Sequence, residues 1–227
     1  MLHKVKICGL STPATLEAAL DARACMVGLV LVEASPRHVS LDAAAGLAAQ
    51  ARGRTAVVAL VVDADDDALR LIVDALRPDW LQLHGRETPE RTAAIRARFG
   101  LPVMKAVGVS RRDDLARASH YAGAADRLLL DAKPPSDAAL PGGNGQRFDW
   151  RLLAGLDLPL PFMLSGGLTP GNVVEAVGIA RPTAGVDVSS GVESAPGVKD
   201  ASAIRAFIDA AREVAGSRPD QPESFRR

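Results

Sequence analysis

The amino-acid sequence predicts an α/β protein, a single-domain (β/α)8 or TIM barrel. Three observations support this fold: eight short apolar runs, helix-like segments between them, and a length of 227 residues that suits one domain of this kind. An open, doubly wound parallel sheet shows the same alternation and is the second candidate. We expect the barrel to occupy residues 1–215. Residues 216–227 are expected to form a flexible tail, because they include two prolines, many charges and little periodicity.

The predicted strands are the eight apolar or β-branched runs, in chain order. They comprise residues 4–8, 26–32, 55–62, 79–84, 102–108, 127–131, 161–165 and 185–190. Several of the intervening segments have helical spacing. Apolar residues recur at i, i+3, i+4 and i+7 over 69–76 and over 204–211, and at i, i+4 and i+7 over 173–180.

Three of the predicted helices begin with the same pair of residue types. Thr12, Thr88 and Thr169 are each followed by proline, so each offers a hydroxyl N-cap and a proline in the first helical turn. Each pair follows a predicted strand by only a few residues. Such short connections are typical of repeated βα units.

Polar residues gather at the carboxyl ends of the predicted strands. Alternate residues of a strand share a face, so Lys6 and Cys8 oppose Val5 and Ile7 in the first strand. In a closed barrel the apolar face packs against the helices, and the carboxyl ends of all strands meet at one mouth. Any one polar strand end could simply meet solvent, but five of them together indicate a site. These five are Cys8, His84, Asp131, Ser165 and Asp187.

Two glycine-containing loops predict a phosphate-binding site. Gly166 and Gly167 follow the seventh strand, and Ser189, Ser190 and Gly191 follow the eighth. Glycine lets the backbone approach an anion closely, and barrels commonly bind phosphate at these two loops. The glycines could also serve only to form tight turns. The "GGNG" at 142–145 lacks the flanking strand and helix of a dinucleotide fingerprint, and we expect segment 132–147 to be a lid or disordered.

Charge and cysteine content exclude several classes of function. The chain carries 27 basic and 27 acidic residues, so we expect no nucleic-acid or membrane partner. Cys8 and Cys25 belong to no C-x-x-C pair or histidine cluster, so neither a metal site nor a disulfide framework is expected. There is no leader-like N-terminus, and no apolar run approaches the roughly 18 residues that span a bilayer. These features predict a soluble, cytoplasmic protein.

Seven motifs resemble those of the phosphoribosylanthranilate isomerase family and occur in the family's order. They are "KICGL" (6–10), "SPRHV" (35–39), "LQLHG" (81–85), "LLLDAK" (128–133), "GGNGQRFDW" (142–150), "LSGGLTPGNV" (164–173) and "GVDVSSGVE" (185–193). The chain departs from the family pattern in its second strand, which lacks the usual aromatics, and at Asn144, where threonine is usual. The motifs span most of the chain.

The resemblance implies a (β/α)8 barrel that uses neither metal nor organic cofactor. It implies an aldose–ketose isomerase of tryptophan biosynthesis, acting on a small phosphorylated substrate as a monomer or homodimer. The reaction is the Amadori rearrangement of N-(5-phosphoribosyl)anthranilate to 1-(2-carboxyphenylamino)-1-deoxyribulose 5-phosphate. By resemblance, Cys8 is the general base, Asp131 is the general acid and Arg37 binds the anthranilate carboxylate. His84 is expected to support the substrate, and Asp187 to contact the ribose hydroxyls or order the phosphate loop.

The chemistry of this reaction places requirements on two of these residues. Asp131 must carry a proton when substrate is bound, and Lys133 would oppose this if its ammonium came near. Cys8 must become a thiolate, which Lys6 or the following helix start could favour. Cys8 could instead be an inert buried thiol.

Two other functions stay open from the sequence. One is a dual-substrate barrel that also accepts a histidine-pathway aminoaldose. Such barrels carry an aspartate at the position of Cys8, which counts against this alternative. The other is a barrel that binds a phosphorylated metabolite without converting it. The presence of both Cys8 and Asp131 counts against that reading.

Overall fold

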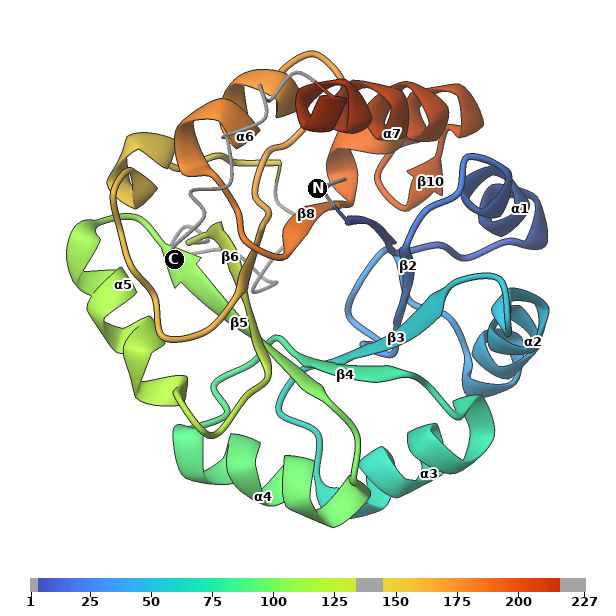
Figure 1. Ribbon diagram of the computed structural model, residues 1–227. Coiled ribbons are helices and arrows are strands. Elements are labelled where there is room, and N and C mark those ends of the chain that lie inside the picture. The colour runs from blue at the N-terminus through green and yellow to red at the C-terminus, as the bar shows by residue number, and fades with distance from the viewer. Residues whose placement is uncertain (1–3, 134–144, 217–227) are drawn as a thin grey trace, which may run out of the picture.

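The strands of the protein close into a parallel barrel, which the computed structural model describes over residues 4–133 and 145–216 (Figure 1). The strands are β1 (Val5–Cys8), β2 (Met26–Val30), β3 (Ala56–Val61), β4 (Trp80–Leu83), β5 (Val103–Val109), β6 (Arg127–Ala132), β7 (Phe162–Leu164) and β8 (Gly185–Val188). Each pairs with the next in the chain, and β8 pairs with β1. The predicted (β/α)8 barrel is thus confirmed, and the open sheet is excluded because both of its edges are joined.

Helices surround the barrel in a ring (Figure 1). They are α1 (Pro13–Asp21), α2 (Leu41–Ala51), α3 (Asp66–Leu76), α4 (Pro89–Phe99), α5 (Arg112–Ala118), α6 (Val173–Ala180) and α7 (Ala201–Gly216). The short 3₁₀ segments are η1 (Ser119–Tyr121), η2 (Trp150–Leu153) and η3 (Ser190–Val192). Between β6 and β7 the described residues contain only η2, so this βα unit departs from the regular pattern there.

Two of the three predicted threonine caps are confirmed. Thr12 Oγ1 accepts a hydrogen bond from the Thr15 amide at 3.3 Å, and Thr88 Oγ1 accepts one from the Arg91 amide at 3.2 Å. The third prediction is wrong, because α6 begins at Val173 with Asn172 as its N-cap.

The side chain of Asn172 explains this later start. Its Oδ1 accepts the Thr169 amide at 2.8 Å, and its Nδ2 donates to the Gly167 carbonyl at 2.9 Å. The amide of Asn172 itself donates to the Thr169 carbonyl. The segment from Thr169 to Asn172 is therefore a turn that precedes the helix.

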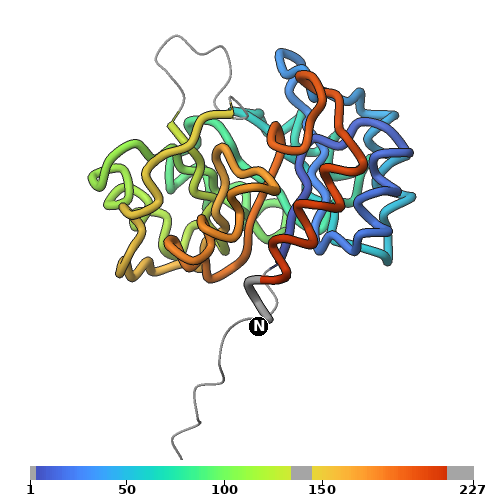
Figure 2. Tube along the Cα trace, turned by 90° about the horizontal axis from the view of Figure 1, so that it is seen from above, coloured from blue at the N-terminus to red at the C-terminus, as the bar shows by residue number. Residues whose placement is uncertain are grey.

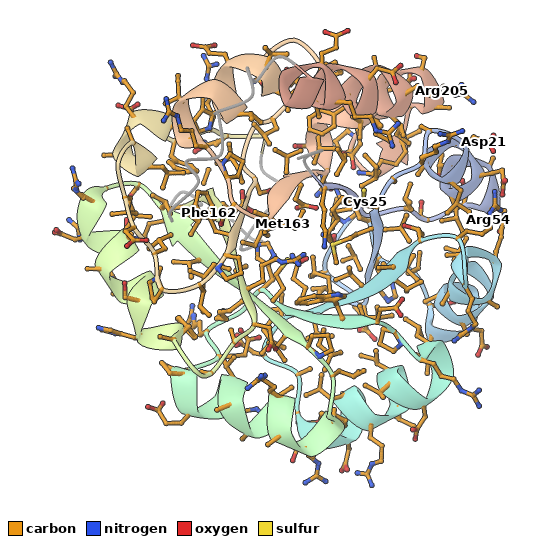
Figure 3. The ribbon with its side chains drawn as sticks, in the orientation of Figure 1. Asp21, Cys25, Arg54, Phe162, Met163 and Arg205 are labelled. Carbon is orange, nitrogen blue, oxygen red and sulfur yellow. The ribbon has the colours of Figure 1, made fainter. Side chains whose placement is uncertain are left out.

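The barrel wall separates two apolar regions. Strand residues that point outward, such as Val5, Ile7 and Phe162, pack with the helices in the main core. Residues that point inward form a smaller cluster, which consists of Met26, Val58, Met104, Ala106, Leu129 and Met163. Phe162 and Met163 are neighbours in β7 and belong to opposite sides of the wall (Figure 3). This alternation confirms the predicted strand faces.

A small antiparallel hairpin lies outside the barrel sheet. Its strands, β9 (Glu193–Ala195) and β10 (Val198–Lys199), follow β8 and η3. Figure 2 shows the segment after β8 and the loop after β2 rising at the same end of the barrel. The predicted tail lies outside the described residues except for Gly216, which ends α7.

Candidate active site

A cavity opens at the carboxyl ends of the barrel strands. It encloses about 810 Å³ of space between protein atoms, part of it continuous with solvent. Ten of the predicted site residues line it: Cys8, Arg37, His84, Asp131, Ser165, Gly166, Gly167, Asp187, Ser189 and Ser190. The eleventh, Gly191, does not line the cavity. Residues from the first, fourth, sixth and eighth strands therefore meet at one mouth, as the strand-end pattern predicted.

Cys8 ends β1 and is buried in the cavity wall. The neighbouring strand makes room for it with Gly28, which pairs with Cys8 in the sheet register. A Cβ atom at Gly28 would lie 2.8 Å from Cys8 Sγ and 3.1 Å from Lys6 Nζ. Any larger residue would thus displace both groups. Gly28 was not predicted as a site residue, although a glycine inside an apolar strand is a signal of close approach.

Burial favours the protonated form of the Cys8 thiol. Burial raises the pKa of Cys8 above its usual value, whereas the nearby Lys6 ammonium lowers it and Asp187 raises it. The effect of burial is the largest. Lys6 therefore acts in the expected direction, but burial has the larger effect, because desolvation disfavours the anion more than Lys6 favours it.

Lys6 and Asp187 form an ion pair inside the barrel. Lys6 Nζ lies 2.8 Å from Asp187 Oδ1, and both side chains are almost wholly buried. Ser165 Oγ donates to the other carboxylate oxygen at 3.3 Å. Burial alone would lower the pKa of Lys6, but Asp187 and Cys8 together raise it above its usual value. A charged lysine therefore persists beside the buried thiol.

A chain of polar contacts leads from Gln82 through His84 to Asp131. Gln82 Nε2 lies 2.9 Å from His84 Nδ1, and His84 Nε2 lies 3.4 Å from Asp131 Oδ2. With the Gln82 amide donating to Nδ1, a neutral imidazole carries its proton on Nε2, facing the carboxylate. The other oxygen of Asp131 accepts the Ala132 amide at 2.8 Å. This chain fixes the carboxylate of Asp131 at the cavity wall.

Two further residues near Asp131 differ in position: Gln82 lies in the cavity wall, and Lys133 contacts Asp114. Gln82 is fully buried, lines the cavity and was missed in the sequence analysis, where only its position opposite the apolar strand face marked it. Lys133 Nζ lies 3.6 Å from the carboxylate of Asp114 on α5. The Lys133 ammonium therefore pairs with Asp114 at the rim of the barrel.

The two glycine loops come together as predicted. Gly166 and Gly167 have φ angles of +84° and +62°, and a Cβ at either would lie within 3.0 Å of neighbouring backbone atoms. A Cβ at Gly191 would lie 1.7 Å from the Leu168 carbonyl oxygen, so this glycine joins the loop after β8 to the loop after β7. Gly191 thus allows the two loops to pack closely together, although it does not itself line the cavity. The hydroxyl of Ser189 donates to the Cys8 carbonyl at 3.1 Å.

Arg37 lies in the cavity wall with its guanidinium held by a carboxylate. Its Nε and Nη2 donate to the two carboxylate oxygens of Glu193 at 2.7 and 2.9 Å. Lys199 Nζ donates to the same carboxylate at 2.6 Å. Neither Glu193 nor Lys199 was predicted, because 156 residues separate Arg37 from Glu193 and only the fold brings them together.

Residues 4–133 and 145–216 contain no cluster of three or more metal-ligating side chains, and no helix there is long and apolar enough to span a bilayer. Most of the predicted lid segment, 132–147, and Asn144 lie outside the described residues.

Comparison with known proteins gives a consistent result. The family model described as N-(5'-phosphoribosyl)anthranilate (PRA) isomerase matches residues 5–210. A relative from Rhodopseudomonas palustris (strain HaA2), named N-(5'-phosphoribosyl)anthranilate isomerase, is 63% identical over 92% of this chain and 95% of its own length. The crystal structure of phosphoribosyl anthranilate isomerase from Thermotoga maritima has a TM-score of 0.84 and 34% identity over 93% of this chain and 99% of its own.

A second similar structure carries a ligand. It is named as a phosphoribosyl anthranilate isomerase in complex with reduced 1-(o-carboxyphenylamino)-1-deoxyribulose 5-phosphate, and has a TM-score of 0.79 and 32% identity over 93% of this chain and 99% of its own. The family match covers nearly the whole barrel, and the residues of its motifs meet in one cavity. The chain therefore belongs to the N-(5'-phosphoribosyl)anthranilate isomerase family.

Proposed function

We propose that this protein converts N-(5-phosphoribosyl)anthranilate to 1-(2-carboxyphenylamino)-1-deoxyribulose 5-phosphate, an aldose–ketose isomerisation in tryptophan biosynthesis. One observation carries the proposal: a single cavity contains a thiol, a carboxyl group, an arginine and two glycine loops, contributed by different strands. Family membership and the ligand named for a structural relative support the same substrate. The protein is expected to act as a monomer or homodimer without metal or organic cofactor.

Asp131 is proposed as the general acid of the first step. Its proton passes to the furanose ring oxygen as the bond between that oxygen and C1′ breaks. The nitrogen lone pair then forms a C1′=N double bond, which opens the ring. The place of Asp131 in the cavity wall beside His84 supports this role, because a general acid must come within reach of the ring oxygen of a bound substrate.

Cys8 is proposed as the general base of the second step. Its thiolate removes the proton from C2′, and the electrons of that bond form C1′=C2′ while the C=N electrons return to nitrogen. The resulting enolamine tautomerises to the keto product, so the product is an isomer of the substrate. The charged Lys6 beside the sulfur supports this role, because it opposes the effect of burial on the thiol.

The remaining residues are proposed to hold the two anionic ends of the substrate. Arg37 binds the anthranilate carboxylate, for which the planar guanidinium is suited. The loops after β7 and β8, which contain Gly166, Gly167, Ser189, Ser190 and Gly191, bind the phosphate. His84 supports the reacting sugar, and Asp187 either contacts its hydroxyls or orders the phosphate loop.

Complementation in living cells tests this function. The gene should restore growth without tryptophan to an auxotroph that lacks the isomerase step, and it should fail to restore a histidine auxotroph that lacks the aminoaldose isomerase. Growth of both strains would favour the dual-substrate alternative. Growth of neither, with the protein present and folded, would favour a barrel that binds a phosphorylated metabolite without turnover.

A further inference from the structure

Two buried residues of the hairpin after β8 connect the groups proposed to bind the two ends of the substrate. We propose that Glu193 and Lys199 are positioning residues that hold Arg37 at a set distance from the phosphate loops. This inference rests on the proposed function, because it takes the ligand to carry both a carboxylate and a phosphate. Neither residue lines the cavity, so each acts through a neighbour.

Glu193 orients the guanidinium of Arg37. Its carboxylate accepts four hydrogen bonds: two from Arg37, one from Lys199 and one from the Gly197 amide at 3.2 Å. Its side chain is only 4% exposed. Burial raises the pKa of Glu193, but the hydrogen bonds and charges of Arg37 and Lys199 lower it below its usual value. The carboxylate is therefore ionised at neutral pH, and its two oxygens fix the plane of the arginine.

Lys199 links Glu193 to Ser189 in the loop after β8, which is proposed to bind the phosphate. Its Nζ donates to the Ser189 carbonyl at 2.9 Å, to the Ser189 hydroxyl at 3.2 Å and to Glu193. These three acceptors satisfy the three protons of an ammonium group. Since the Ser189 hydroxyl also donates to the Cys8 carbonyl, the chain of contacts continues to the end of β1.

The charge of this cluster suits an anionic ligand. Arg37 is a cation and Glu193 is an anion. Burial lowers the pKa of Lys199 below its usual value, although Glu193 opposes this effect. With Lys199 protonated, the cluster has one net positive charge among side chains that are at most 8% exposed. A buried charge is weakly screened and attracts an anion strongly. A carboxylate placed against Arg37 would balance it. Glu193 thus sets the direction of the arginine, while Lys199 sets the position of the adjoining loop.

Binding of two matched ligands tests the role of Glu193. The probes are the reduced product analogue, which bears the carboxylate, and the same compound with a phenyl group in place of the carboxyphenyl group. Glu193→Gln should weaken the first by about tenfold or more and the second by no more than about twofold. Equal weakening of both would indicate a general structural role and overturn the proposal. Glu193→Asp, which keeps the charge on a shorter arm, should lie between wild type and Glu193→Gln.

A double-mutant cycle tests whether Glu193 acts through Arg37. In an Arg37→Ala background, Glu193→Gln should have no further effect on the carboxylate-bearing ligand, whereas additive losses would contradict the coupling. Ser194→Ala is the matched control on the same hairpin, because Ser194 is exposed and its hydroxyl contacts only the Val198 carbonyl among the contacts described.

Inorganic phosphate separates the role of Lys199 from that of Glu193. Lys199→Met should weaken phosphate binding as well as analogue binding, because it releases Ser189, whereas Glu193→Gln should leave phosphate binding within about twofold of wild type. Unchanged phosphate affinity in Lys199→Met would refute the link to the loop. If the wild-type protein bound neither analogue, the proposed function itself would fail. This outcome differs from equal weakening of both ligands by Glu193→Gln, which would overturn only the role of Glu193.

Discussion

The Lys6 ammonium lies 2.8 Å from the Asp187 carboxylate, inside the barrel and on the same strand face as the Cys8 thiol. Lys6 places a positive charge beside the thiol and lowers its pKa, whereas burial and Asp187 raise it, and burial has the largest effect. Three observations meet here: the alternation of β1, the register that pairs Lys6 with Asp187 across β1 and β8, and the space left by Gly28. The electrostatics of this pair lead to the first prediction.

The pH dependence of turnover should move when Lys6 is replaced. The base must be a thiolate, so kcat/KM is expected to rise with pH up to a pKa above that of an ordinary cysteine. Lys6→Met removes the cation that lowers the pKa of Cys8, so this rise should shift to higher pH. The pH profile of kcat/KM measures this shift, and a profile that stays in place would contradict it.

Two further measurements support that experiment. Lys6→Met leaves the Asp187 charge unpaired, which costs about 3–5 kcal/mol of stability. The double variant Lys6→Met with Asp187→Asn removes the whole pair and should still shift the profile upward. In a Cys25→Ser background Cys8 is the only cysteine of the chain, so the pH dependence of its alkylation reports its pKa directly.

Loss of the Cys8 thiol should lower kcat strongly and change ligand affinity little. Cys8→Ser is expected to lower kcat by about 10²–10⁴-fold, because a hydroxyl is a far weaker base in the same place. Affinity for the reduced product analogue should stay near that of wild type. The exposed Cys25 provides the matched control, and Cys25→Ser should leave kcat unchanged. Wild-type turnover in Cys8→Ser would remove Cys8 from the mechanism.

Loss of the proposed acid should have a similar signature. Asp131→Asn cannot deliver a proton to the ring oxygen, so kcat should fall by about 10²–10⁴-fold while analogue binding persists. Asparagine keeps the acceptor for the Ala132 amide, which preserves the local backbone. Asp113→Asn on the exposed face of α5 is the control. A fully active Asp131→Asn enzyme would end the proposed role of Asp131.

Gly28 should tolerate no side chain, although it lies inside a regular strand. Gly28→Ala places a methyl group 2.8 Å from Cys8 Sγ, so the sulfur must shift, and we expect kcat to fall by up to about 100-fold. The control is Gly46→Ala in α2, where no atom lies within 4 Å of the added Cβ. That change should stabilise the protein by about 0.4–1 kcal/mol. Equal activity in both variants would show that Cys8 needs no fixed position.

Arg37→Ala should separate affinity from chemistry. The substitution removes the proposed partner of the anthranilate carboxylate, so KM should rise while kcat changes less. Binding of the analogue that lacks the carboxylate should be nearly unaffected. Steady-state kinetics and titration with both ligands check this. Unaltered affinity for the carboxylate-bearing ligand would refute the contact.

The order of elements, the strand faces and the location of the mouth were predictable from the sequence. They depend on local periodicity: β1 alternates Lys6 and Cys8 with Val5 and Ile7, and this alternation decides which side chains enter the barrel. The helix start at Thr169 was predicted wrongly, because the side chain of Asn172 competes with the threonine cap. A local pattern cannot rank two such caps.

The sequence by itself determined that an acid, a thiol and two glycine loops reach one end of a barrel, since parallel strands deliver their carboxyl ends together. Only the tertiary structure decided how these groups are tuned. Burial raises the pKa of Cys8, although the Lys6 ammonium lowers it. Glu193 accepts hydrogen bonds from Arg37, which lies 156 residues away in the sequence. Desolvation and ion pairing depend on packing between distant segments, and neither can be read from the spacing of residues along the chain.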